Sequence, residues 1–252
     1  MAVKLVDTEQ LDSSLTWLAD SIRAKTGTEG TLYFPDGFIS EVDSIETPDD
    51  MLAELENVEY ILSNGFNDYS SMFKERYYMS EVPVGILRNT ANGTNFANMF
   101  YFGGLCTEMP QFDVSNGTDF NHMFYGMADV ETFPSFDTAN GLNFDGMFGM
   151  CMNTRTIEGI DLSSATSVNL MFDMCSSLEN ITFNGVIKVS GLDLSPCVYL
   201  TSESLMSAIN ALYDWASEGN TETHYLKVGD DLFLIPEVDY AIATQKGWTI
   251  TR

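Results

Sequence analysis

The amino-acid sequence predicts an α/β solenoid, in which the chain winds into leucine-rich-repeat-like coils of period 24. Three observations indicate this fold: a Met-Phe pair, an Asn-Gly pair and a single aspartate each recur at this same fixed spacing. A constant period in the twenties is typical of repeat proteins, in which each repeat forms one coil. The Met-Phe pairs are Met99-Phe100, Met123-Phe124, Met147-Phe148 and Met171-Phe172.

Each repeat combines a helical and an extended apolar pattern. Phe120, Met123, Phe124 and Met127 lie at i, i+3, i+4 and i+7, which predicts one stripe of a short helix. A tighter apolar spacing follows each stripe and predicts a short strand. The strand residues are Val130, Phe133 and Phe136, then Ile157, Ile160 and Leu162, then Leu178, Ile181 and Phe183.

Threonines precede three of these stripes, at positions 94, 118 and 166. Their hydroxyls are expected to cap the free N–H groups of the helices. A single coil cannot bury its apolar face, whereas stacked coils cover one another.

The sequence divides into three parts. Residues 1–62 are expected to form a helical attachment segment, and residues 63–198 the solenoid, of about five coils. Residues 199–252 are expected to form an α/β cap. The cap elements are a helix over 201–217 that Thr201 caps, a strand over 225–228, a helix over 236–245 and a strand over 248–251.

The charge is extreme, with 37 acidic residues against 11 basic ones and a net charge of −26. Such a chain repels phosphate backbones, which argues against binding to nucleic acid or to an anionic membrane. The acidity predicts solubility, or a preference for cationic partners. The N-terminus lacks the apolar segment of a secretory signal, and no stretch reaches the ~20 apolar residues of a membrane span. The protein is therefore expected to be made in the cytoplasm.

The four cysteines contain no CxxC pair, which argues against a zinc site. Cys151 and Cys175 occupy the same place in adjacent coils. A disulfide between them is conceivable, but the favoured interpretation is a ladder of small buried groups.

A row of aspartates, Asp113, Asp137 and Asp161, allows two interpretations. Stacked carboxylates could bind calcium, which prefers oxygen ligands. The favoured alternative is that each carboxylate accepts a hydrogen bond from a turn N–H.

Tyr101 and Tyr125 follow the Met-Phe pair at equivalent positions. They could hold a sugar ring, although ordinary packing of a helix flank is the favoured interpretation. His122, at the edge of the helical stripe, is a further candidate, although a surface histidine is the favoured interpretation. Arg155 is a rare cation that is expected to pair with acids. No catalytic motif is present, and neither an enzymatic activity nor a cofactor is expected.

The repeat Met171-Phe-Asp-Met-Cys-Ser-Ser-Leu178 resembles the BspA-like leucine-rich repeats of mycoplasma surface lipoproteins and other bacterial surface proteins. Earlier repeats depart from this pattern, because Gly103 and Met127 replace the cysteine. The resemblance implies leucine-rich-repeat-like coils over about half of the chain.

A second resemblance lies outside the repeats. The stretch Leu18 to Gly27, the stretch Leu32 to Ile39 and the ending Ala243 to Ile250 resemble tail-associated proteins of phages that infect Gram-positive bacteria. This resemblance implies a non-enzymatic virion protein of the tail tip, baseplate or fibre. The N-terminal segment would dock on other tail proteins, and the solenoid would recognise a glycan or protein on the host surface. A homo-oligomer is expected because tail parts usually are oligomeric.

Two other functions are open at this point. A bacterial surface adhesin would share the repeats, but the missing secretory signal and lipid-attachment cysteine argue against it. A wall-degrading enzyme would need a convergent acid pair or a Cys/His arrangement, which the sequence does not single out.

Overall fold

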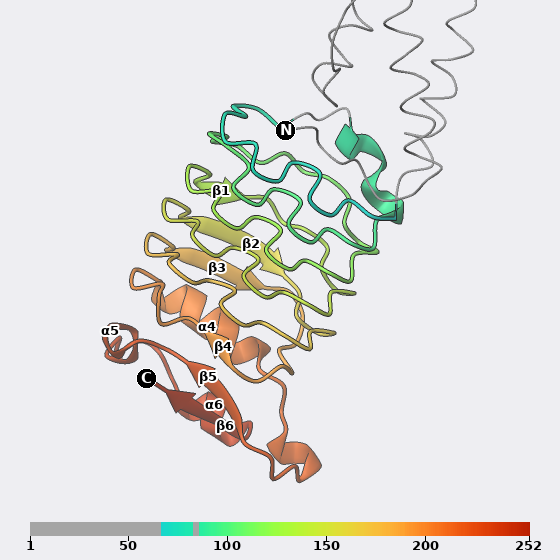
Figure 1. Cartoon of the computed structure of the whole chain (residues 1–252). Helices are drawn as coiled ribbons and strands as arrows, with labels where there is room; N and C mark the ends of the chain where they lie inside the picture. The colour runs from blue at the N-terminus through green and yellow to red at the C-terminus, as the bar shows by residue number, and fades with distance from the viewer. Residues whose placement is uncertain (1–66, 83–85) are drawn as a thin grey trace, which may run out of the picture.

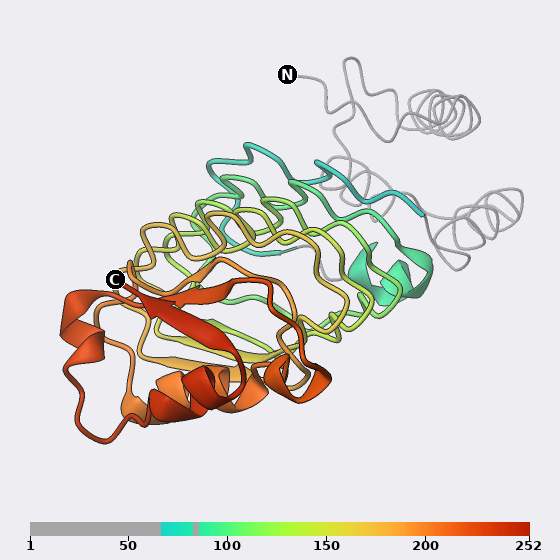
Figure 2. The ribbon, with the colours of Figure 1, turned by 90° about the horizontal axis from the view of Figure 1, so that it is seen from below.

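The computed structural model describes residues 67–82 and 86–252. Over most of this range the chain runs in coils that lie against one another in parallel, and seen from below they superimpose around a common interior (Figures 1 and 2). Isolated parallel bridges join equivalent positions of successive coils, for example Asn95 to Asp119 and Asp119 to Asn143. The expected segment 1–62 lies outside the described residues.

A three-stranded parallel sheet covers one side of the coils. Its strands are β1 (Thr132–Phe133), β2 (Thr156–Ile160) and β3 (Asn180–Phe183), in the order β1-β2-β3. The register pairs Thr132 with Thr156 and Thr156 with Asn180, so partners lie one repeat period apart. These strands occur at the tighter apolar spacing that the sequence shows. A short 3₁₀ helix, η1 (Ile86–Asn92), lies near the first coil.

The prediction of short helices around the Met-Phe pairs is wrong, because these segments form successive tight turns. Every second N–H donates within the coil, as Met99 does to the carbonyl of Phe96 (3.1 Å). The intervening N–H groups donate to the next coil, as Phe100 does to Met123 (2.8 Å) and Phe102 to Tyr125 (2.8 Å). An α-helix would direct all these donors along its own axis and leave the coils unconnected.

Two positions in each coil adopt a left-handed backbone, which ends the helical conformation after every turn. The first turn column contains Ser71, Asn98, His122, Gly146 and Leu170. The second turn column contains Glu75, Phe102, Gly126, Met150 and Met174. All ten have φ between 47° and 76°. For most residues other than glycine, this left-handed region is higher in free energy than the ordinary helical or extended regions.

The threonines do not cap helices. The Oγ1 hydroxyls of Thr94, Thr118 and Thr166 donate to carbonyls of the preceding coil at 3.1, 3.0 and 2.9 Å. The hydroxyls therefore join one coil to the next, and the backbone carbonyl of Thr94 accepts the bond from Thr118.

The interior is a ladder of stacked rings. The second residue of each Met-Phe pair stacks on the next, with ring centroids 5.7 Å apart for Phe100–Phe124, 5.6 Å for Phe124–Phe148 and 5.9 Å for Phe148–Phe172. The partner methionines are also buried, so all four Met-Phe pairs belong to the core. Offset stacking of buried rings adds to the free energy of burying their area.

The two cysteines at equivalent positions of adjacent coils form the predicted ladder of small buried groups. Cys151 and Cys175 are free and buried, and their thiols donate to the carbonyls of Phe124 (3.2 Å) and Phe148 (3.0 Å) in the preceding coil. Burial raises the pKa of Cys175 to about 12, which keeps it a thiol at neutral pH.

Helix α4 (Ser202–Ala211) lies against the edge of β3 (Figure 1). Thr201 caps it as predicted, because its side chain accepts from the N–H of Ser204, but the helix is shorter than the expected 201–217. The hydroxyls of Ser204 and Ser207 accept from the N–H groups of Ile181 (3.0 Å) and Phe183 (3.1 Å). Serine side chains thus satisfy backbone donors that another strand would otherwise pair.

A second parallel sheet follows, in the order β4-β5-β6. Its strands are β4 (Leu192–Asp193), β5 (His224–Lys227) and β6 (Trp248–Thr251), and the remaining helical segments are η2 (Ala216–Glu218), α5 (Asp230–Phe233) and α6 (Ala241–Gln245). Because β4 pairs with β5, backbone bonds connect the two sides of the boundary expected after residue 198.

The ring ladder predicts a large stability loss for Phe124→Ala. This ring contacts Phe100 and Phe148 along the ladder and also Phe133 and Phe136, so its removal leaves a cavity. We expect the free energy of unfolding to fall by about 3–5 kcal/mol in chemical denaturation. Met152→Ala, at an exposed side chain, should change it by less than about 0.5 kcal/mol. Equal losses for the two variants would contradict the ladder as the main source of stability.

Candidate functional site

Three of the four predicted binding residues lie together at the turn side of the coils. The rings of Tyr101 and Tyr125 stack with centroids 5.2 Å apart and planes at 10°. His122 lies 4.9 Å from Tyr125, and Phe102 meets Tyr101 edge-on at 4.9 Å. These four residues, all half-buried, are called the aromatic cluster.

Glycines of the following coil make room for three of these rings. Gly126, Gly146 and Gly149 lie one period after Phe102, His122 and Tyr125. A Cβ at Gly126 would lie 2.4 Å from the Phe102 ring, and one at Gly149 would lie 2.6 Å from Tyr125. Phe102 is absent from the residues predicted to bind, although an aromatic residue followed one period later by glycine is a signal that would have identified it.

The flat faces of both tyrosines are already covered. Lys74 places its ammonium 5.2 Å from the Tyr101 ring centre, Tyr125 covers the other face, and Gly149 lies beneath Tyr125. A sugar ring binds to an aromatic side chain through an open face, and these rings present their edges instead. The geometry favours the packing interpretation of the tyrosine pair over the sugar-binding one.

His122 is held by a short chain of hydrogen bonds. The amide nitrogen of Asn121 donates to the carbonyl of Asp145 (3.3 Å), which leaves its amide oxygen to accept from Nδ1–H of His122 (2.9 Å). Burial lowers the pKa of His122 below its usual value, and the nearby carboxylate of Asp145 partly opposes this shift. The neutral imidazole is therefore the form that the fold prefers.

Arg155 lies apart from the cluster, and the structure pairs it with Glu179 of the next coil. Both side chains are more than a third exposed, so the ion pair contributes little stability. The expectation that Arg155 pairs with an acidic neighbour is confirmed.

The aspartate row lies at another edge of the coils. Oδ1 of Asp113 accepts from the N–H of Ser115 (2.9 Å), Asp161 from Ser163 (2.8 Å) and Asp137 from Ala139 (3.3 Å), which confirms the turn interpretation. Hydrogen bonds from the side chain and backbone of Ser115 lower the pKa of Asp113. In the part of the chain that the structure describes, no group of three or more His, Cys, Asp or Glu side chains is arranged to hold a metal ion.

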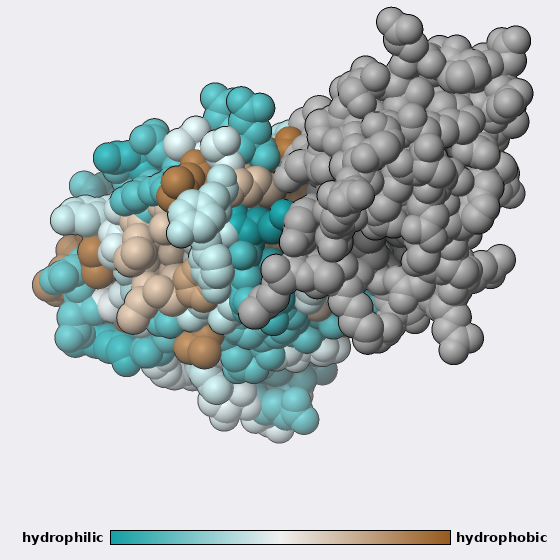
Figure 3. Space-filling view, turned by 45° about the horizontal axis from the view of Figure 1, so that its top comes forward, coloured by the Kyte–Doolittle hydropathy of each residue, from teal (hydrophilic) through white to brown (hydrophobic). Residues whose placement is uncertain are grey.

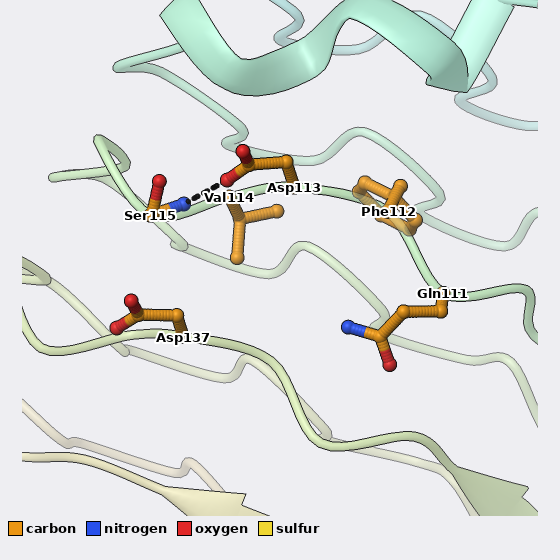
Figure 4. A pocket seen from close by; sticks show the side chains of 6 residues that line it. All are labelled: Gln111, Phe112, Asp113, Val114, Ser115 and Asp137. Carbon is orange, nitrogen blue, oxygen red and sulfur yellow. Dashed lines mark hydrogen bonds between the residues drawn. The ribbon is translucent and has the colours of Figure 1, made fainter.

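A shallow depression of about 460 Å³ opens between Asp113 and Asp137 (Figure 4). Gln111, Phe112, Val114 and Ser115 complete its lining. The Gln111 side chain donates to the carbonyl of Ser135 (2.7 Å), and the Asp113 carboxylate is used by its own turn. The depression is thus bordered by side chains with structural roles.

The comparisons with known proteins agree with part of the sequence interpretation. The family described as "Mycoplasma protein of unknown function, DUF285" matches residues 67–184, the segment that contains the Met-Phe repeats. This match is consistent with the BspA-like resemblance, and it does not reach the stretches that resemble phage tail proteins. No curated protein and no solved structure matches the chain. Within 67–82 and 86–252, no helix has the length and apolar character to span a membrane.

The close packing of Tyr125 on Gly149 can be tested by a double-mutant cycle. Gly149→Ala should lower the free energy of unfolding by about 1–3 kcal/mol, because the new methyl group overlaps the Tyr125 ring. In a Tyr125→Ala background the same substitution should cost much less, since the ring that it overlaps is gone. Additive losses, measured by chemical denaturation, would contradict the proposed contact.

The neutral His122 predicts a pH dependence. Because burial lowers its folded pKa below 6.5, the unfolded chain binds more protons between the two pKa values, and stability should fall as pH drops below about 6.5. We expect the loss of unfolding free energy between pH 7.5 and pH 5.5, two conditions chosen to bracket the ordinary His pKa of about 6.5, to be smaller in His122→Asn. Asn98 already occupies the same column, so the variant should fold. An identical loss in both proteins would show that other groups cause it.

Proposed function

We propose that the chain is a non-enzymatic recognition protein of a phage virion, built on an α/β solenoid of leucine-rich-repeat-like coils. The observation that carries this proposal is the stacking of equivalent positions, which turns a short sequence repeat into a long surface. Repeat proteins of this architecture use such surfaces for binding.

The use of the reactive side chains supports a binding role over a catalytic one. The thiols of Cys151 and Cys175 are buried donors to carbonyls, the row of aspartates closes turns, and His122 is bonded to Asn121. Each of these groups has a structural partner. The described surface can therefore bind another molecule mainly through its shape and its contact area.

The position in the virion rests on the resemblance of residues 18–39 and 243–250 to tail-associated proteins. In this proposal residues 1–62 dock on other tail proteins, and the coils face a glycan or protein of the host surface. The protein would be assembled into the tail as a homo-oligomer after synthesis in the host cytoplasm.

A bacterial surface protein is the second candidate, and the match to a family described from Mycoplasma favours it. The two candidates share the binding surface and differ in the particle that carries it. Antibodies against the protein should label tails of purified phage particles if the first is right. Labelling of intact cells, with none on particles, would support the second.

Recognition itself can be tested with the purified, fluorescently labelled protein on intact host cells. We expect saturable binding by the full chain and by a chain that lacks residues 1–62, because the proposal assigns recognition to the coils. Unlabelled protein should compete with both. Failure of both forms to bind, also when multimerised on beads, would contradict the recognition role.

A further inference from the structure

Large apolar side chains line the turn side of the coils, from Phe102 of the aromatic cluster to the last Met-Phe repeat. Phe102, Met150 and Met174 belong to the second turn column, and Leu170 to the first. Leu170 is 62% exposed and Met174 53%, and Phe102 and Met150 are half-buried. These four residues are called the apolar strip. The space-filling view shows apolar side chains gathered among hydrophilic ones on one face of the described part (Figure 3).

Backbone bonds join the coils that carry the strip, and Gly126 lies between Phe102 and Met150 in the second turn column. The N–H of Phe102 donates to Tyr125, the N–H of Gly126 to Gly149 (2.8 Å each), and the N–H of Met150 to Asp173 (2.7 Å). Neighbouring members of one column therefore lie about 5 Å apart, the distance between adjacent strands.

The fold does not require apolar residues at these positions. The first turn column also accepts Ser71, Asn98 and Gly146, and the second accepts Glu75 and Gly126. Asparagine and glycine adopt a left-handed backbone at the lowest cost, whereas a bulky side chain there is strained.

Leu170 and Met174 thus lower stability through a left-handed backbone (φ 54° and 55°), and more than half of each residue remains exposed to solvent. Asparagine or glycine would avoid this backbone strain at both positions. The presence of leucine and methionine therefore indicates that these side chains serve binding and not folding. Methionine and leucine are also side chains that adapt to the shape of a protein partner.

We propose that the apolar strip docks a basic amphipathic helix of a partner protein. Two carboxylates are chain neighbours of turn-column residues, Asp145 next to Gly146 and Asp173 next to Met174. Oδ1 of Asp145 accepts from the hydroxyl of Ser167 and the N–H of Asn169, and the whole chain carries a net charge of −26. An apolar strip on a strongly acidic chain is complementary to a helix that has one apolar face and basic flanks.

The spacing also fits a helix that lies along the stack. One turn of an α-helix rises about 5.4 Å, close to the distance of about 5 Å between coils, so residues at i, i+4 and i+7 would meet successive coils. The N-terminal segment of a second copy is a poor occupant, because residues 1–66 contain 14 acidic and 3 basic residues.

The test uses the full-length protein and a peptide of about 18 residues, or about five helical turns, built from leucine and lysine with one apolar face. The critical variant is Leu170→Asn with Met174→Glu. Both new residues occur elsewhere in the same columns, at Asn98 and Glu75, so the variant should fold and be at least as stable as the original. The matched control is Leu234→Glu, which adds the same charge at a side chain that is 74% exposed in the C-terminal part.

The sign of the effect separates docking from simple charge attraction. The double variant is more acidic, so pure attraction to the lysines would strengthen binding. Docking on the strip predicts instead that binding at about 0.15 M salt, measured by calorimetry, weakens at least about tenfold. The control should bind like the original, and a peptide with glutamate in place of lysine should bind far more weakly.

Three results would overturn the inference: no binding of the basic peptide, equal or stronger binding by the double variant, or equal binding of the acidic peptide. The inference relies on the proposed function only for the idea that the protein recognises other molecules. If the double variant loses the peptide but still binds host cells, recognition uses another surface. If the original binds the peptide but not cells, the host-recognition role fails and the docking surface remains.

Discussion

The structure depends on one interaction, the backbone hydrogen bond between residues about one period apart. In the turn segments every second N–H donates to the next coil, and in β1, β2 and β3 the ladder is that of a parallel sheet. A backbone that pairs with its own copy one period later forces equivalent side chains into columns. The stacked phenylalanines, the buried thiols and the threonine hydroxyls that bond to the preceding coil are all consequences of this pairing.

The columns impose a constraint as well as a benefit. A ring in one coil needs space in the next, and the glycines at 126, 146 and 149 provide it for Phe102, His122 and Tyr125. Where the constraint is absent, the columns hold residues as different as Asn98 and Leu170. The bulky residues of the apolar strip therefore indicate a role in binding, because the fold would accept residues with less backbone strain at these positions.

The stack also has to end, since an open edge of parallel strands invites pairing with another chain. Helix α4 covers β3 with serine hydroxyls, and the β4-β5-β6 sheet follows. The turn pattern continues past the last Met-Phe pair: the N–H of Cys197 donates to Leu194 as that of Cys175 does to Phe172 (both 3.1 Å).

The sequence by itself determined which positions are equivalent and which are buried, because a strict period places the same residue types in the same column. It also predicted the strands β1, β2, β3, β5 and β6 and the cap at Thr201, and it favoured the turn role of Asp113 over calcium binding. The tertiary structure alone decided that the Met-Phe segments are turns, because apolar residues at i, i+3, i+4 and i+7 lie on one side of either a helix or this series of turns. It also decided that Tyr101 and Tyr125 cover each other and that Phe102 joins them, since the neighbours of a ring come from other coils and not from its own segment.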